Sequence, residues 1–309
     1  MLWISVTILI FKDSERLHRL ADKMTLLNQN GQLDKCTPPK FVFPEEALIS
    51  DGPLPKKVGD SFKNTINITA CFDPDGQRVS SYAEPIEFGG TGSMFEPDLF
   101  ISARHIFLAA MARLNQGGRL FFIDKNGLPK SDHYNYTFYG TANINNRAVT
   151  FPLELIAMGD PYRPKDLAIF RAKNPPPELT PLEFGPPASL GNTVYTSGRV
   201  ASFNPFNDDL NSIRKKVLDD FINFNFTGHI VGIVTNLPYN TYSGFKKIYN
   251  IRTALEPGFS GGPVFDKNGK MIGLTVSVTP GLSFLHAISA EDQEIFIKEL
   301  RDKGIIPKK

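Results

Sequence analysis

The chain has 309 residues, enough for one bilobed fold or two small domains, and its 41% hydrophobic and 21% charged residues exclude a disordered or fibrous protein. A formal net charge of +2 gives no electrostatic reason to expect a nucleic-acid partner or an anionic membrane. Two cysteines, Cys36 and Cys71, are too few for a disulfide framework, and no His/Cys cluster has metal-ligand spacing, so neither a metal nor an organic cofactor is expected.

Residues 1–60 are predicted to form an N-terminal extension outside the catalytic fold. The apolar run 2–11 lacks the basic start of a signal peptide, and it is shorter than the roughly 20 residues of a membrane helix. A truncated anchor, a weak export signal and a locally packed strand or helix all stay open, and so do membrane association and the compartment. Residues 13–33 carry apolar side chains at helical spacing, which predicts a short amphipathic helix.

Short strands are predicted from about residue 62, beginning with the alternating segment 64–72. A Gly-rich stretch, 88–95, precedes an apolar strand that ends in small residues and His105, and residues 107–114 then favour a helix. A histidine at such a junction is well placed as a general base, because its imidazole titrates near neutral pH. A lone histidine of this kind is more often structural, so the neighbouring motifs must decide.

An aspartate and a Pro-rich boundary follow in the middle of the chain. Asp166 comes directly before the alternating apolar strand 167–170, whereas the nearby Asp160 has no strand after it. The Pro-rich stretch 174–187 is stiff and cannot pair as a central strand. It therefore predicts a boundary between two structural units.

The second half again shows strand patterns, at 191–198 and 226–234. Between them, residues 207–225 carry apolar side chains at near-helical spacing and predict a helical insertion. Near the C-terminus, residues 283–289 predict a last strand. Ser289 is then expected to cap a helix that runs to about Lys303.

Ser260 lies in a Gly-flanked turn, 256–265, with glycine two residues before it and two after it. Small neighbours let a substrate backbone approach, and consecutive N–H groups in such a turn can stabilise an oxyanion. Gly-rich turns are also common as purely structural features. The nucleophile elbow of α/β-hydrolases fits the glycine spacing but requires a helix after the serine, whereas a strand, a turn at 266–269 and a second strand follow here.

The run 250–264 resembles the nucleophile segment of chymotrypsin-fold serine peptidases and is most similar to the trypsin-like branch that includes the bacterial HtrA/Deg proteases. Segments 88–106 and 160–171 resemble that family's histidine and acid segments, in the same order. The resemblance covers about residues 62–303. It implies an all-β fold of two antiparallel six-stranded β-barrels with a C-terminal helix. No peptide-binding PDZ module is expected in this sequence.

The resemblance also implies a domain plan and a mechanism. The first barrel would span 61–175, the linker 176–188, and the second barrel with the C-terminal helix 189–309. His105, Asp166 and Ser260 would form a catalytic triad in the cleft between the barrels and cleave protein or peptide substrates through an acyl-enzyme. The backbone N–H groups of Gly258 and Ser260 would hold the oxyanion.

Three departures from secreted trypsins refine this expectation. Phe259 replaces the aspartate that pairs with a newly cut N-terminus, so that activation switch is not expected, and Ile106 replaces the cysteine beside the histidine. Ala254 occupies the position of the aspartate that selects basic substrates. A small or apolar P1 pocket shaped by Ala254, Val276 and Val278 is predicted instead. The alternative is a catalytically silent protease-fold binding module, and the oligomeric state stays open.

Overall fold

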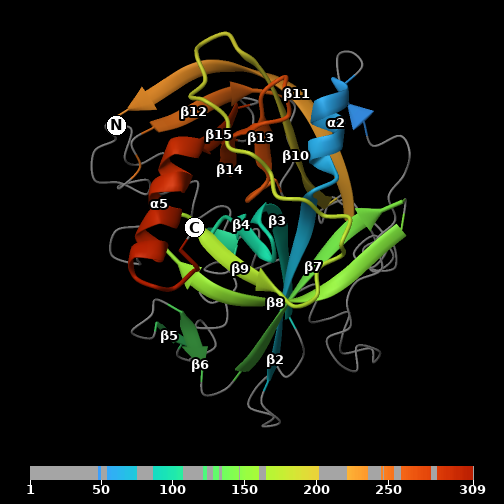
Figure 1. Cartoon of the computed structure of the whole chain (residues 1–309), viewed down its shortest axis with the longest axis vertical. Coiled ribbons are helices and arrows are strands. Elements are labelled where there is room, and N and C mark those ends of the chain that lie inside the picture. The colour runs from blue at the N-terminus through green and yellow to red at the C-terminus, as the bar shows by residue number, and fades with distance from the viewer. Residues whose placement is uncertain are drawn as a thin grey trace.

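The computed structural model describes residues 48–49, 54–74, 86–106, 121–123, 128–131, 134–145, 147–159, 165–201, 221–235, 245, 247–253, 259–279 and 284–308. These residues form mostly β-strands, together with the helices α2 (Lys56–Phe62) and α5 (Ala290–Asp302) (Figure 1). No helix in this part of the chain is long and apolar enough to cross a membrane.

Six antiparallel strands close into the first barrel in the order β2-β3-β4-β9-β8-β7. Their bounds are β2 (Thr65–Pro74), β3 (Ile86–Glu96), β4 (Leu99–Ser102), β7 (Tyr134–Ile144), β8 (Arg147–Met158) and β9 (Ala168–Ala172). The strands β5 (Phe121–Ile123) and β6 (Pro129–Ser131) form a separate two-stranded sheet. Closure leaves this barrel without an unpaired edge.

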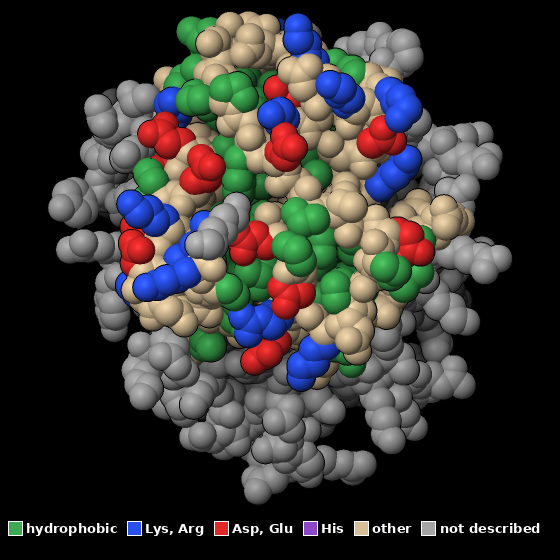
Figure 2. Space-filling view, in the orientation of Figure 1, with side chains coloured by type: hydrophobic (Ala, Val, Ile, Leu, Met, Phe, Trp, Pro, Cys, Tyr) green, Lys and Arg blue, Asp and Glu red, His purple; other side chains and the backbone are tan. Residues whose placement is uncertain are grey.

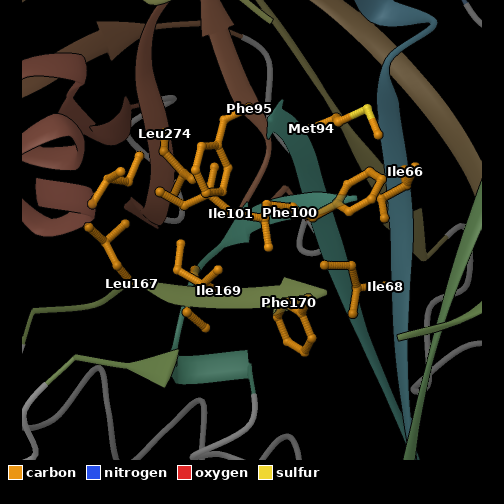
Figure 3. Close-up of a cluster of buried hydrophobic side chains, with 14 of the residues drawn as sticks. Ile66, Ile68, Met94, Phe95, Phe100, Ile101, Leu167, Ile169, Phe170 and Leu274 are labelled. Atoms are coloured by element: carbon orange, nitrogen blue, oxygen red, sulfur yellow. The ribbon is translucent and has the colours of Figure 1, made fainter. Parts of the chain in front are cut away.

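Aromatic and β-branched side chains fill the first barrel. Along β2, Ile66 and Ile68 lie on one face and are fully buried (Figure 3). Aromatic rings from strands that are not paired with each other meet there, with Phe138 of β7 and Phe170 of β9 at a centroid distance of 5.2 Å. Figure 3 also shows Leu274, which comes from the second barrel, close to Phe95, and both side chains belong to the same buried cluster. The apolar core is therefore continuous between the barrels.

The second barrel is a sheet in the order β1-β11-β10-β13-β14-β15-β12, closed by the pairing of β11 with β12. Six of its strands pair antiparallel, and the short β1 adds to β11 in parallel. The bounds are β1 (Leu48–Ile49), β10 (Thr193–Ala201), β11 (Phe221–Thr235), β12 (Lys247–Arg252), β13 (Pro263–Phe265), β14 (Met271–Thr279) and β15 (Phe284–Ser289). The predicted all-β double barrel with a C-terminal helix is thus confirmed.

The Pro-rich stretch lies between β9 and β10 and is bonded to both barrels. The amide of Leu182 donates to the carbonyl of Met94 in β3 over 2.8 Å. The amide of Met271, at the start of β14, donates to the carbonyl of Glu183 over 2.8 Å. The connection therefore runs along the junction of the two barrels as an anchored strap.

The helix α2, at the boundary between the predicted extension and the first barrel, contacts the second barrel. Val58 of α2 is fully buried, and Ser61 Oγ donates to the carbonyl of Gly269 over 2.7 Å. The ring of Phe62 meets that of Phe265 edge-on, with centroids 5.3 Å apart. A helix of seven residues, about two turns, presents too short a pattern to reveal such a docking face from sequence. The helix expected over 13–33 lies outside the described residues.

The helix predicted over 207–225 is wrong for its last part, since Phe221–Asn225 belong to β11. Their pairing with β10 decides their conformation, because tertiary pairing overrides a local helical spacing. Residues 207–220, and the helix expected over 107–114, lie outside the described residues.

The C-terminal helix α5 confirms the prediction from Ser289, whose hydroxyl accepts a hydrogen bond from the amide of Asp292. The helix packs on the second barrel, and two ion pairs connect it to the first. Lys165 pairs with Glu299 at 2.5 Å, and Arg301 pairs with Glu96. On the face shown in Figure 2, the described acidic and basic side chains are interspersed.

Candidate active site

The turn that carries Ser260 enters β13 and depends on two glycines. Gly261 has φ of +81°, which favours glycine, and the amide of Gly262 donates to the carbonyl of Phe259 over 2.8 Å. A Cβ at Gly262 would lie 2.1 Å from the carbonyl oxygen of Ser197. The glycines therefore let the chain turn tightly while the Ser260 side chain stays half-buried.

Both barrels hold this turn. The amide of Thr91, in β3, donates to the carbonyl of Ser260 over 2.9 Å. The hydroxyl of Ser102 donates to the carbonyl of Thr91 over 2.6 Å and stiffens that contact. On the other side, the amide of Gly261 donates to the carbonyl of Thr275 in β14 over 2.7 Å. The serine is thus fixed at the junction of the barrels.

His105 follows the end of β4 and faces the serine. Its Nε2 lies 2.7 Å from Ser260 Oγ. The imidazole is half-buried, with 39% of the side chain exposed. Since Nε2 meets a hydroxyl, the neutral ring can accept the hydroxyl proton when Nδ1 carries the hydrogen.

Asp166 lies just before β9, beside the end of β4, because Ser102 and Ala168 pair in the β4–β9 ladder. Its Oδ2 lies 2.6 Å from His105 Nδ1, and its Oδ1 accepts a hydrogen bond from the His105 amide over 2.7 Å. The carboxylate therefore orients the ring through Nδ1–H and also fixes the backbone of the histidine.

The environment of His105 raises its pKa above the ordinary value of 6.5. Burial disfavours the imidazolium and is the largest single influence, but the charge of Asp166 and its hydrogen bond together outweigh it. The nearby charge of Arg104 acts in the same direction as burial. The net result is an imidazole that holds a proton more firmly than a free histidine.

Comparison with known proteins identifies the family. The model of the trypsin-like peptidase domain matches residues 90–274, which is more than half of the chain and includes all three residues above. The chain belongs to the trypsin-like peptidase family. It is a serine-type peptidase, and the resemblance deduced from the sequence motifs is confirmed.

Solved structures share the fold of this trypsin-like peptidase. Deg5 is 15% identical with a TM-score of 0.51, over 79% of this chain and 92% of that one. The active form of the Rv3671c protease from M. tuberculosis is 18% identical with a TM-score of 0.50, over 87% and 92%. An inactive, serine-to-alanine form of Rv3671c is 17% identical with a TM-score of 0.50, over 86% and 97%. No curated protein matched the chain.

The other residues predicted for the site of this peptidase have different positions. Val276, in β14, is buried in the apolar cluster that joins the barrels. Gly258 and Ala254, and the side chain of Val278, lie outside the described part. Phe259 is fully buried among apolar side chains of the second barrel, so its ring faces the barrel core and not the solvent.

Sequence reasoning missed the residues that support the turn and the histidine. Thr91 and Ser102 act through a backbone amide and a short hydrogen bond, and these contacts have no motif of their own. Arg104 is buried and donates to the carbonyl of Gly159. The only feature of the sequence that could have drawn attention to Arg104 was its charge directly beside His105.

Proposed function

We propose that this peptidase cleaves peptide bonds with Ser260 as the nucleophile, His105 as the general base and Asp166 as the group that orients the base. The observation that carries the proposal is the line of contacts from the Asp166 carboxylate through the imidazole to the Ser260 hydroxyl, 2.6 and 2.7 Å long. Nucleophile, base and orienting acid within hydrogen-bond reach are what acyl transfer requires.

The proposed reaction has two halves. Ser260 Oγ attacks the scissile carbonyl while its proton passes to His105 Nε2, and His105 then protonates the leaving amine. Water, deprotonated by His105, attacks the acyl-enzyme and releases the carboxylic acid and the free serine. The backbone N–H groups of Gly258 and Ser260 are proposed to hold the oxyanion in both halves.

We further propose a small or apolar residue at P1. Val276 supports this as one apolar wall of the pocket, because its apolar side chain directly follows Thr275, whose carbonyl accepts a hydrogen bond from the nucleophile turn. The uncharged Ala254 gives no partner for a basic side chain. The apolar wall is completed by Val278 in this proposal.

A peptide library with every amino acid at P1 tests this function. The protein is incubated with the library, and mass spectrometry locates the cut bonds, with Ser260→Ala as the control. Cleavage after Ala, Val or Leu that disappears in the control is expected. Cleavage after Lys or Arg would overturn the P1 proposal alone, whereas no cleavage by folded protein would favour a binding module on a protease scaffold.

A further inference from the structure

Arg104, immediately before His105, is buried, with 6% of its surface exposed, and no other lysine or arginine whose side chain the structure describes is buried. A buried guanidinium is costly unless its N–H groups find acceptors, so its position requires an explanation. It lies two residues after the end of β4 and directly before the proposed base. Its location thus puts a fixed positive charge beside the site.

The guanidinium reaches across to the segment that carries the acid. Arg104 Nη1 donates to the carbonyl of Gly159, just after β8, over 2.8 Å. The amide of Gly159 donates to the carbonyl of Leu167, next to Asp166, also over 2.8 Å. A Cβ on Gly159 would lie 1.8 Å from the carbonyl oxygen of Lys165. The two ends of the segment 159–167 are therefore held together, and Arg104 bonds to their junction.

Among the described residues, the charged groups that act on His105 are Asp166 and Arg104. Asp166 faces Nδ1, and the uncharged hydroxyl of Ser260 faces Nε2. Lys165, beside Asp166, pairs with Glu299 of α5 at 2.5 Å. Arg104 lowers the pKa of His105 while Asp166 raises it. Arg104 thus opposes the retention of a proton on the base.

We propose that Arg104 is a positioning residue, which holds the acid segment against the end of the histidine strand and places a fixed positive charge beside His105. The proposal rests on the function proposed above. It adds a second support for the Asp166–His105 contact, independent of that contact itself. It also explains why an arginine is tolerated at a buried place between two catalytic elements.

Three variants separate the two parts of this role. Arg104→Met removes the charge and the hydrogen bond at similar length, and Arg104→Lys keeps the charge but lacks the planar fork. Arg171→Met is the control, because Arg171 lies on β9 of the same barrel but is half-exposed and pairs only loosely with Asp98, at 3.8 Å. NMR titration of the His105 ring, assigned with His105→Ala, is measured beside kcat and KM.

In Arg104→Met the titration midpoint of His105 is expected to rise, and kcat to fall about 10- to 100-fold with little change in KM. In Arg104→Lys the midpoint stays near the native one while kcat still falls. Native midpoint and native kcat in Arg104→Met, with only a lower Tm, would overturn the proposal. If Arg104→Met does not fold, Arg104→Lys decides the outcome. A native kcat in Arg104→Lys would overturn the positioning role. A raised titration midpoint of His105 in Arg104→Lys would overturn the charge role.

A measurement that does not depend on cleavage distinguishes a failure of this proposal from a failure of the proposed function. The low-field NMR signal of the proton between His105 Nδ1 and Asp166 reports their contact whether or not the protein cleaves anything. Loss of this signal in Arg104→Met, with retention in Arg171→Met, supports the positioning role even in an inactive protein. An unchanged signal in a folded Arg104→Met contradicts it.

Discussion

At the scale of single residues, the site depends on the glycines of the nucleophile turn as much as on the three side chains proposed to take part in the reaction. Gly261 brings the nucleophile turn against β3, where a Cβ would lie 2.0 Å from the carbonyl oxygen of Thr91. Because that contact is with backbone rather than with a flexible side chain, the turn cannot accommodate a methyl group without moving Ser260.

We therefore predict that Gly261→Ala lowers kcat/KM at least about 100-fold, since an ångström of displacement at a catalytic group has effects of this size. Gly191→Ala is a matched control. Gly191 has a similar φ of +80°, but a Cβ there meets nothing within 4 Å. The control is expected to lose about 1 kcal/mol of stability and no activity. Equal activity of both variants in a peptide-cleavage assay would contradict this account.

The pKa of His105 predicts the pH dependence of the enzyme. In the proposed mechanism His105 must be neutral to accept the proton of Ser260, so kcat/KM should rise with pH through a midpoint above 6.5. Asp166→Asn should lower that midpoint and reduce kcat by about 10⁴-fold, because the ring loses its orienting partner. A profile of kcat/KM from pH 5 to 9 measures both. A native midpoint below 6.5 would be incompatible with the proposed contact.

The same raised pKa contributes to stability with a defined sign. The folded protein binds the His105 proton more tightly than the unfolded chain, so this contribution is complete below pH 6.5 and is lost as pH rises through the folded pKa. Urea denaturation of the native protein and of His105→Ala should therefore differ more at pH 5.5 than at pH 9. A larger difference at pH 9 would refute the sign.

At the scale of elements, the residue before the nucleophile anchors its turn. Phe259 is fully buried in the second barrel, and a Cβ on Gly198 would lie 2.8 Å from its ring. Apolar burial thus fixes the turn where secreted trypsins use an ion pair. The chain needs no new N-terminus for this contact.

Phe259→Ala should accordingly destabilise the fold by about 3–5 kcal/mol, the usual cost of removing a buried aromatic ring. The loosened turn should also lower kcat. Leu190→Ala provides the comparison, because Leu190 is 63% exposed and its truncation should change stability by less than about 0.5 kcal/mol. Chemical denaturation of the two variants measures the contrast, and similar losses would show that Phe259 is not an anchor.

Local sequence patterns predicted the elements whose stabilising contacts lie close together in the sequence. The strand–turn–strand after Ser260 was predictable because Asp266 caps its own turn, accepting from the amides of Asn268 and Lys270. His105 and Asp166 could be proposed from the sequence because each borders a short apolar strand. The docking of α2 was not, since Ser61 meets Gly269 from 208 positions away. Arg104 escaped for the same reason, because its acceptor lies 55 positions further on.

At the scale of the whole molecule, the site requires that the two barrels keep a fixed position relative to each other. The Pro-rich strap between β9 and β10 is hydrogen-bonded to both barrels, and α5 reaches from the second barrel to the first (Figure 1). Arg301 of α5 pairs with Glu96 at the end of β3, and both side chains are largely buried, with 21% and 13% exposed. This pair lies across the junction on which His105 and Ser260 depend.

We predict that Arg301→Ala costs about 1.5–3 kcal/mol of stability, as expected for a charged hydrogen bond that leaves its partner buried. The charge-swapped double variant Glu96→Arg with Arg301→Glu should recover part of this loss. Thermal denaturation of Glu96→Arg, of Arg301→Glu and of the double variant completes the double-mutant cycle. Additive losses in the double would mean that the pair does not couple the barrels.

The most direct test of the central claim is labelling by a fluorophosphonate probe, which reacts only with an activated serine. Native protein, Ser260→Ala and His105→Ala are treated in parallel, and the labelled peptide is identified by mass spectrometry. The account predicts one modified residue, Ser260, in the native protein and no label in either variant. Folded native protein that takes no label, or label that persists in His105→Ala at the native rate, would contradict the proposed triad.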